Sequence, residues 1–93
     1  MQPIHELLNR IRWDKVYAQA DFRIGYFDRV EDKLILVPFK ELWFDDEDHF
    51  GFQILDEDGV THHIPLHRVK EVYRNGELIW HRDYFQQELD AES

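Results

Sequence analysis

The sequence contains no cysteine, which excludes both a disulfide framework and a metal site built from thiolates. It also lacks any apolar run close to the roughly 20 residues that a membrane-spanning helix requires. Its first residues, MQPIHELLNRIRW, lack the basic segment and apolar core of a secretory signal. We therefore expect a soluble, cytoplasmic protein that works in a reducing compartment and has no membrane partner.

Basic side chains are scarce, since eleven lysines and arginines oppose twenty acidic side chains and the formal net charge is −9. A protein that holds nucleic acid by neutralising many phosphates is normally basic. This balance disfavours nonspecific tracking along RNA, and we expect no DNA partner. The acidity is uneven, because residues 83–93 contain four acids and no base. Without them the net charge is −5, which leaves room for a small local anion site.

The length of the chain limits the number of domains that it can form. Ninety-three residues, 43% of them hydrophobic and fourteen of them aromatic, suffice for one packed core but not for two. We expect a single compact domain at residues 1–82, followed by an acidic C-terminal tail at residues 83–93.

One helix is predicted, close to the N-terminus. Pro3 suits the first turn of a helix, where its missing N–H would have no partner in any case. Four apolar residues follow at the i, i+3, i+4, i+7 spacing of a single buried stripe, namely Ile4, Leu7, Leu8 and Ile11. Residues 14–21 show no period and are predicted to form a connection.

About six short strands are predicted after this helix. Apolar residues alternate along residues 22–26, and KLILV follows at residues 33–37. The remaining strands form two hairpins around turn sequences: residues 50–55 with 60–64 around Asp58-Gly59, and 69–74 with 77–81 around Asn75-Gly76. The prediction is an α+β domain whose antiparallel strands form one curled sheet or a small, partly open barrel.

Two turns of this predicted sheet share one sequence frame, VPFKEL at residues 37–42 and IPLHRV at 64–69. In each, the residue before proline favours extended backbone, and proline then begins a single turn of α- or 3₁₀-helix whose apolar residues point into the core. Core packing does not determine which residues occupy the two polar positions of the frame. They hold Lys and Glu in the first frame but His67 and Arg68 in the second.

His67 and Arg68 are therefore the candidate phosphate contacts. The first turn of a helix leaves backbone N–H groups unpaired, which favours an anion. The guanidinium of Arg68 offers a planar fork that matches phosphate oxygens, and His67 can donate a hydrogen bond or transfer a proton near neutral pH. The structural alternative is that His67 caps a carbonyl and Arg68 pairs with a surface acid.

Four segments in order, HELLNRIRWD, IGYFDR, IPLHRVKEV and GELIWHR, resemble the small RNA cyclic group end recognition domain family over residues 4–82. That family is proposed, from its domain context, to recognise RNA ends that carry a 2′,3′-cyclic phosphate. The resemblance implies that His67 and Arg68 form its His-Arg pair, and that Tyr26, Asp28 and Arg29 form the polar end of its first strand. Many archaeal members carry histidine where this chain has Asp28, so the resemblance supports binding better than catalysis by two histidines.

Neither a metal nor another cofactor is expected. Adjacent strand residues such as His62 and His63 point to opposite faces, and positions 63 and 67 would lie roughly 13 Å apart on an extended strand, whereas metal ligands lie within roughly 2.0–2.2 Å of one ion. His63 and His67 share strand parity, which makes His63 the candidate to assist His67. Among the aromatics that can stack on bases, most are needed in the core, and Tyr26 is the one we expect at the site.

Three functions are consistent with these residues. The first is a module that binds RNA 3′ ends through His67, Arg68 and Arg29. The second is an acidic adaptor for an RNA-processing protein. The third is a weak cyclic phosphoesterase, which requires a second acid or base such as His63. Because no nucleophile elbow or phosphate loop is present, we expect binding rather than catalysis. A basic spot that joins Arg29 and Arg68 favours the first function, whereas ion pairs between these arginines and Asp28 or the acidic turns favour the second.

Overall fold

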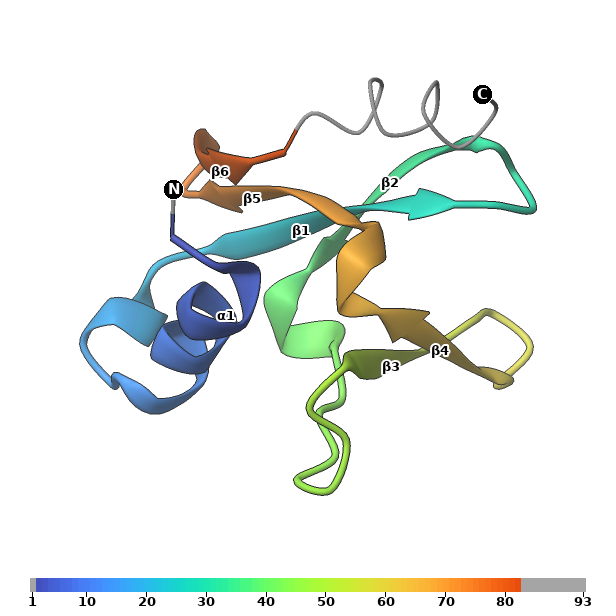
Figure 1. Cartoon of the computed structure of the whole chain (residues 1–93), viewed down its shortest axis with the longest axis horizontal. Helices are drawn as coiled ribbons and strands as arrows, with labels where there is room; N and C mark the ends of the chain where they lie inside the picture. Colours follow the sequence, from blue (N-terminus) through green and yellow to red (C-terminus); the bar gives the residue numbers. More distant parts are fainter. Residues whose placement is uncertain (1, 83–93) are drawn as a thin grey trace.

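The chain forms one helix followed by six strands in two sheets (Figure 1). The structure, a computed structural model, describes residues 2–82, so the predicted tail at residues 83–93 lies outside the described residues. The elements are α1 (Ile4–Trp13), β1 (Phe22–Asp28), β2 (Lys33–Pro38), β3 (Gly51–Leu55), β4 (Thr61–Pro65), β5 (Val69–Arg74) and β6 (Glu77–His81). This order confirms the predicted α+β class. Within residues 2–82 no helix is long and apolar enough to cross a membrane.

The helix α1 lies where the apolar periodicity predicts it. Pro3 is extended, with φ −60° and ψ 143°, and directly precedes the first helical residue. All four stripe residues are buried. The helix ends at Trp13, and the Asp14 carboxylate then accepts the N–H groups of Val16 and Tyr17. The predicted connection therefore contains a 3₁₀ turn, η1 (Tyr17–Gln19).

The two predicted hairpins are confirmed. β3 pairs with β4, and β5 pairs with β6, in both cases antiparallel. Asn75 and Gly76 have φ values of 52° and 84°, as a two-residue hairpin turn with positive φ at both positions requires. The Asn75 side chain also accepts the N–H of Asp21 at 2.9 Å, while the Asn75 N–H donates to the Asp21 carbonyl at 2.7 Å. These two hydrogen bonds attach the β5-β6 turn to Asp21, the residue that directly precedes β1.

The six strands are antiparallel, as predicted, but they do not form the single curled sheet that was one of the two expected arrangements. The strands divide into a four-stranded sheet of order β2-β1-β5-β6 and a separate two-stranded sheet, β3-β4. The division occurs at the two proline turns, because each one ends a strand and redirects the chain. Figure 1 shows the β3-β4 hairpin projecting from the four-stranded sheet, to which it is joined through these turns.

The two turns with the shared sequence frame have nearly the same conformation. Pro38 has φ −62° and ψ 138° before η2 (Phe39–Glu41), and Pro65 has φ −65° and ψ 146° before η3 (Leu66–Arg68). Leu42 and Val69, which follow these 3₁₀ turns, are buried. The predicted structural role of the frame, a corner closed by apolar residues, is confirmed.

Phe52 of β3 joins the two sheets. Its ring is 1% exposed and meets the edge of the Tyr26 ring from β1, with 6.4 Å between the ring centroids and 80° between the ring planes. The centroid of the Phe44 ring lies 5.9 Å from that of Phe52. The hairpin therefore joins the common core through buried side chains, of which Phe52 from β3 is the most completely buried and Ile64 from β4 is the second.

We predict that Phe52→Ala lowers the free energy of unfolding by about 3–5 kcal/mol, because it removes a buried ring and leaves a cavity between the two sheets. Urea denaturation followed by circular dichroism measures this change. Val60→Ala, at an exposed position of the same hairpin, should change stability by less than about 0.5 kcal/mol. Equal stabilities of the two variants would contradict the role given to Phe52.

Candidate nucleic-acid interface

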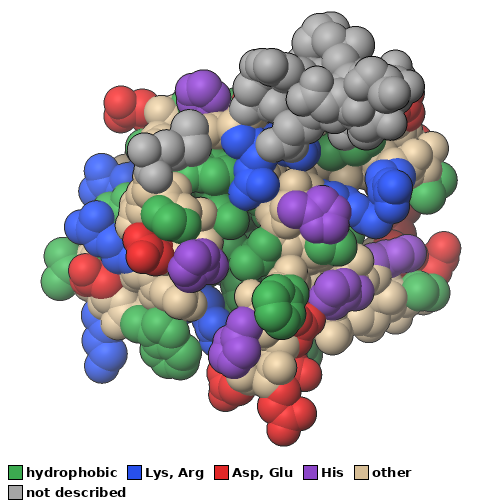
Figure 2. All heavy atoms as spheres, in the orientation of Figure 1, with side chains coloured by type: hydrophobic (Ala, Val, Ile, Leu, Met, Phe, Trp, Pro, Cys, Tyr) green, Lys and Arg blue, Asp and Glu red, His purple; other side chains and the backbone are tan. Residues whose placement is uncertain are grey.

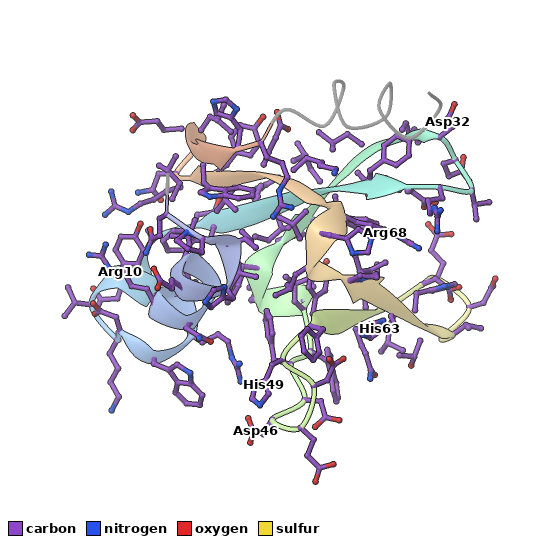
Figure 3. All side chains as sticks on the ribbon, in the orientation of Figure 1. Arg10, Asp32, Asp46, His49, His63 and Arg68 are labelled. Atoms are coloured by element: carbon purple, nitrogen blue, oxygen red, sulfur yellow. The ribbon has the colours of Figure 1, made fainter. Side chains whose placement is uncertain are left out.

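The turn η3 brings together basic side chains from four segments of the chain. Arg68 lies on the turn itself, Arg29 follows β1, Lys70 belongs to β5, and Arg82 follows β6. All four positive charges act on the imidazole of His67. We name these five residues the cation cluster. Figure 3 shows Arg68 on the turn that links the hairpin to the four-stranded sheet.

The cation cluster lowers the pKa of His67 below its ordinary value. Partial burial of the ring is the largest cause, and repulsion from Arg68, Lys70, Arg29 and Arg82 follows in that order. A lowered pKa means that the ring is mostly neutral at pH 7 and donates one N–H. An anion bound beside it would reverse the repulsion and favour the charged imidazolium.

The arginines of the cluster have unused hydrogen-bond donors. Among the described residues, the side chains of Arg29, Arg68 and Arg82 make no ion pair and no hydrogen bond. The Nε atoms of Arg68 and Arg82 are buried without a hydrogen-bond partner. A buried donor without a partner is costly, and an anion can satisfy it. The arginines are thus not neutralised by Asp28 or by the acidic turns, which favours the first of the three functions.

Lys70 bonds the turn η3 to the core through its buried side chain. It is the one buried charged residue of the described chain, and its Nζ donates to the carbonyl oxygen of His67 at 3.1 Å. The Arg82 N–H donates to the Lys70 carbonyl at 2.9 Å, which fixes the end of β6 beside β5. The backbone that carries His67 and Arg68 is therefore bonded to the core of the domain.

Asp28 and Tyr26 occupy structural positions. The Asp28 carboxylate accepts the N–H groups of Val30 and Glu31 at 2.8 and 3.2 Å, and so shapes the turn that carries Arg29. Tyr26 is 4% exposed; burial and the charge of Asp28 raise the pKa of its phenol. The ring has no free face on which a base can stack. A contact between either residue and RNA stays a prediction.

His63 and His67 line one cleft of about 870 Å³ between α1 and the β3-β4 hairpin. The turn η3 interrupts the extended chain between them, so strand parity alone does not describe their relation. His63 Nε2 lies 2.7 Å from a carboxylate oxygen of Asp48, and His62 is paired with Asp56 at the same distance. No group of three or more His, Cys, Asp or Glu residues in the described chain is arranged to hold a metal ion.

The ring of His63 lies directly over Gly51. A Cβ atom at position 51 would lie 2.6 Å from His63 Nε2 and equally close to the Ile64 carbonyl oxygen. These distances are far shorter than any ordinary contact, so no larger residue fits at this position without moving β4. Glycine therefore allows the close approach that brings His63 to Asp48.

Lys70 and Arg82 belong to the candidate site, and the sequence motifs did not indicate either of them. The Asn75-Gly76 turn could have indicated them. If residues are paired outward from this turn, the end of β6 falls beside the beginning of β5, where Lys70 lies. The count is misleading by itself, since the β5-β6 register shifts between Val72 and Tyr73. Without knowledge of that irregularity, the partner of Lys70 cannot be assigned from the sequence.

Comparison with known proteins gives one family. The model of the MJ1316 RNA cyclic group end recognition domain matches residues 1–82. The UPF0248 proteins MmarC5_1387 and MMP0286, from two strains of Methanococcus maripaludis, are each 32% identical over 80 residues, which covers 83% of this chain and 95% of theirs. No solved structure shows a significant match. The family is the one that the sequence motifs resemble.

We predict that His67 titrates below its ordinary value of 6.5, and that Arg68→Gln raises the pKa of His67 by removing the charge that repels the imidazolium most strongly. NMR titration of the imidazole resonances measures both values. Arg23→Gln is the matched control, because Arg23 is exposed and paired with Asp21. A His67 pKa at or above 6.5 in the wild type would show that the cations are not gathered around it.

Proposed function

Because the chain belongs to the MJ1316 RNA cyclic group end recognition domain family, we propose that it binds RNA 3′ ends that carry a 2′,3′-cyclic phosphate. The observation that carries the proposal is the cation cluster around His67 in a chain with a net charge of −9. Its arginines have no acidic partner among the described residues, and two of their Nε–H groups are buried without an acceptor.

The chemistry of the cluster suits a terminal cyclic phosphate. Such a phosphate is a monoanion with two non-bridging oxygens, and the guanidinium of Arg68 can donate two parallel N–H groups to them. His67 offers a further donor beside it, and Arg29 is exposed and able to approach from the solvent side. One compact group of cations fits one phosphate, whereas a long RNA backbone would require a basic track.

A weak cyclic phosphoesterase is the second candidate, because His63 and His67 line the same cleft and His63 is held by a carboxylate as an acid–base histidine often is. In that reaction water would add to phosphorus, and the bond from phosphorus to the 2′ or the 3′ oxygen would break. Incubation of a cyclic-ended RNA with the protein, followed by separation of the phosphomonoester product, tests it. Product that is lost in His63→Ala and in His67→Ala would establish hydrolysis.

We predict that Arg68→Ala weakens binding of a cyclic-ended RNA by about ten- to hundredfold, because a charge-assisted hydrogen bond is lost. His67→Ala should weaken it by about two- to tenfold, since a neutral donor contributes less. Fluorescence anisotropy with short RNAs ending in 2′,3′-cyclic phosphate, 3′-phosphate or 3′-hydroxyl measures affinity and preference together.

Arg10→Ala controls for a general loss of charge, because Arg10 is an exposed arginine on α1 that pairs with Asp14. This variant should bind as the wild type does. Equal and negligible binding of all three RNA ends would refute the proposal and favour the acidic adaptor for a protein partner.

We also predict that affinity for the cyclic phosphate rises as the pH falls from 7.5 to 5.5. The phosphate keeps its charge over this range, whereas His67, whose pKa is lowered in the free protein, takes up a proton that the bound anion stabilises. Because other histidines also titrate, the relevant quantity is the difference between wild type and His67→Gln. Parallel pH profiles for the two proteins would exclude a charged His67 in the complex.

A further inference from the structure

The cleft beside the cation cluster has walls from different parts of the chain. One wall is α1, from which the buried Leu8 and the half-buried Arg12 line the cleft. The opposite wall is the segment that leads into β3, together with the start of η3. Figure 2 shows this face, on which histidine and basic side chains border a hollow with hydrophobic side chains inside it. The cleft is thus apolar at its bottom and polar at its rim.

The cleft and the cation cluster are continuous. His67 and Arg82 belong to the cluster and also line the cleft. A ligand whose phosphate lies against the cluster therefore has the cleft directly beside it. The volume of about 870 Å³ lies within the usual range of ligand sites, roughly 300–1,000 Å³.

Phe50 is the exposed aromatic of this cleft. It lines the cleft, and yet its side chain is 81% exposed. The predicted strand at residues 50–55 included it, but β3 begins only at Gly51. An aromatic ring that stands largely exposed beside a group of cations is the arrangement that proteins use to stack the bases of single-stranded RNA.

The backbone of Phe50 is held on both sides. Its N–H donates to the Asp48 carboxylate at 2.9 Å, and its carbonyl oxygen accepts the N–H of Leu66 in η3 at 2.8 Å. The other carboxylate oxygen of Asp48 is bonded to His63. The backbone of Phe50 is thus fixed relative to the turn that carries His67 and Arg68, which reduces the backbone entropy lost on binding.

A side chain of α1 connects the two walls. Arg12 of α1 reaches across to the hairpin side, where its guanidinium lies 4.6 Å from the centre of the Phe44 ring and 3.5 Å from a carboxylate oxygen of Asp46. The Arg12 side chain therefore contacts both walls of the cleft. Figure 3 shows Asp46 and His49 in the loop that this contact steadies.

We propose that this cleft binds the base of the terminal nucleotide, with the ring of Phe50 as its stacking platform. The inference rests on the proposed function, because the cation cluster is what places the phosphate and hence the nucleoside. Stacking on an aromatic ring is tolerant of base identity, so the cleft binds all four bases with similar affinity. The apolar bottom and the aromatic rim select a nucleoside over a free phosphate.

The test compares two cyclic-ended RNAs that differ only in whether the terminal nucleotide carries its base or is abasic. For the wild type, removal of the base should weaken binding by about five- to hundredfold, the range of one base–aromatic stack. Phe50→Ala should weaken binding of the complete RNA by a similar factor and leave the affinity for the abasic RNA unchanged. Because the side chain is exposed, the variant should retain the fold, as thermal melting shows.

Trp43→Ala is the matched control, because Trp43 belongs to the same connection before β3, is 66% exposed and lines a different hollow. It should bind both RNAs as the wild type does. If Phe50→Ala and the abasic RNA bind normally while Arg68→Ala does not, the base site is refuted and the phosphate site stands. If no cyclic-ended RNA binds, both the phosphate site and the base site are refuted.

Discussion

The contact between Phe52 and Tyr26 is the interaction on which the remainder of the structure depends. It holds the two-stranded hairpin on the four-stranded sheet, and the hairpin in turn supplies one wall of the cleft and positions the turn η3. It also explains the burial of Tyr26, whose ring the hairpin covers. A residue that looks like a polar site member in the sequence is therefore part of the joint between two sheets.

The two proline turns show how structural and chemical roles are divided along one short frame. Proline and the apolar positions give both turns the same backbone conformation, whereas the two polar positions differ and only the second turn carries a His-Arg pair. The difference also depends on neighbours, because Arg29, Lys70 and Arg82 surround the second turn. The site is a property of the tertiary arrangement and not of the His-Arg pair alone.

Local features of the fold were predictable from the sequence. The buried stripe of α1, the Asn-Gly hairpin and both 3₁₀ turns depend on residues that are close together in the chain, and each formed as expected. The division into two sheets could not be predicted, because the direction in which a proline turn sends the chain depends on the surface against which the next strand packs. Phe50 was misread for a related reason, since alternation marks it as a strand residue but cannot show how little its neighbours cover it.

The distribution of charge has a consequence for how RNA would approach the molecule. A protein that neutralises one terminal phosphate releases few counterions, so its affinity should depend only weakly on ionic strength. Outside the cation cluster, acidic side chains outnumber basic ones in the sequence, so a longer strand would gain little additional attraction. Under the proposed function, this distribution of charge would favour an RNA that approaches with its end first, and affinity would not depend on the length of the strand behind that end.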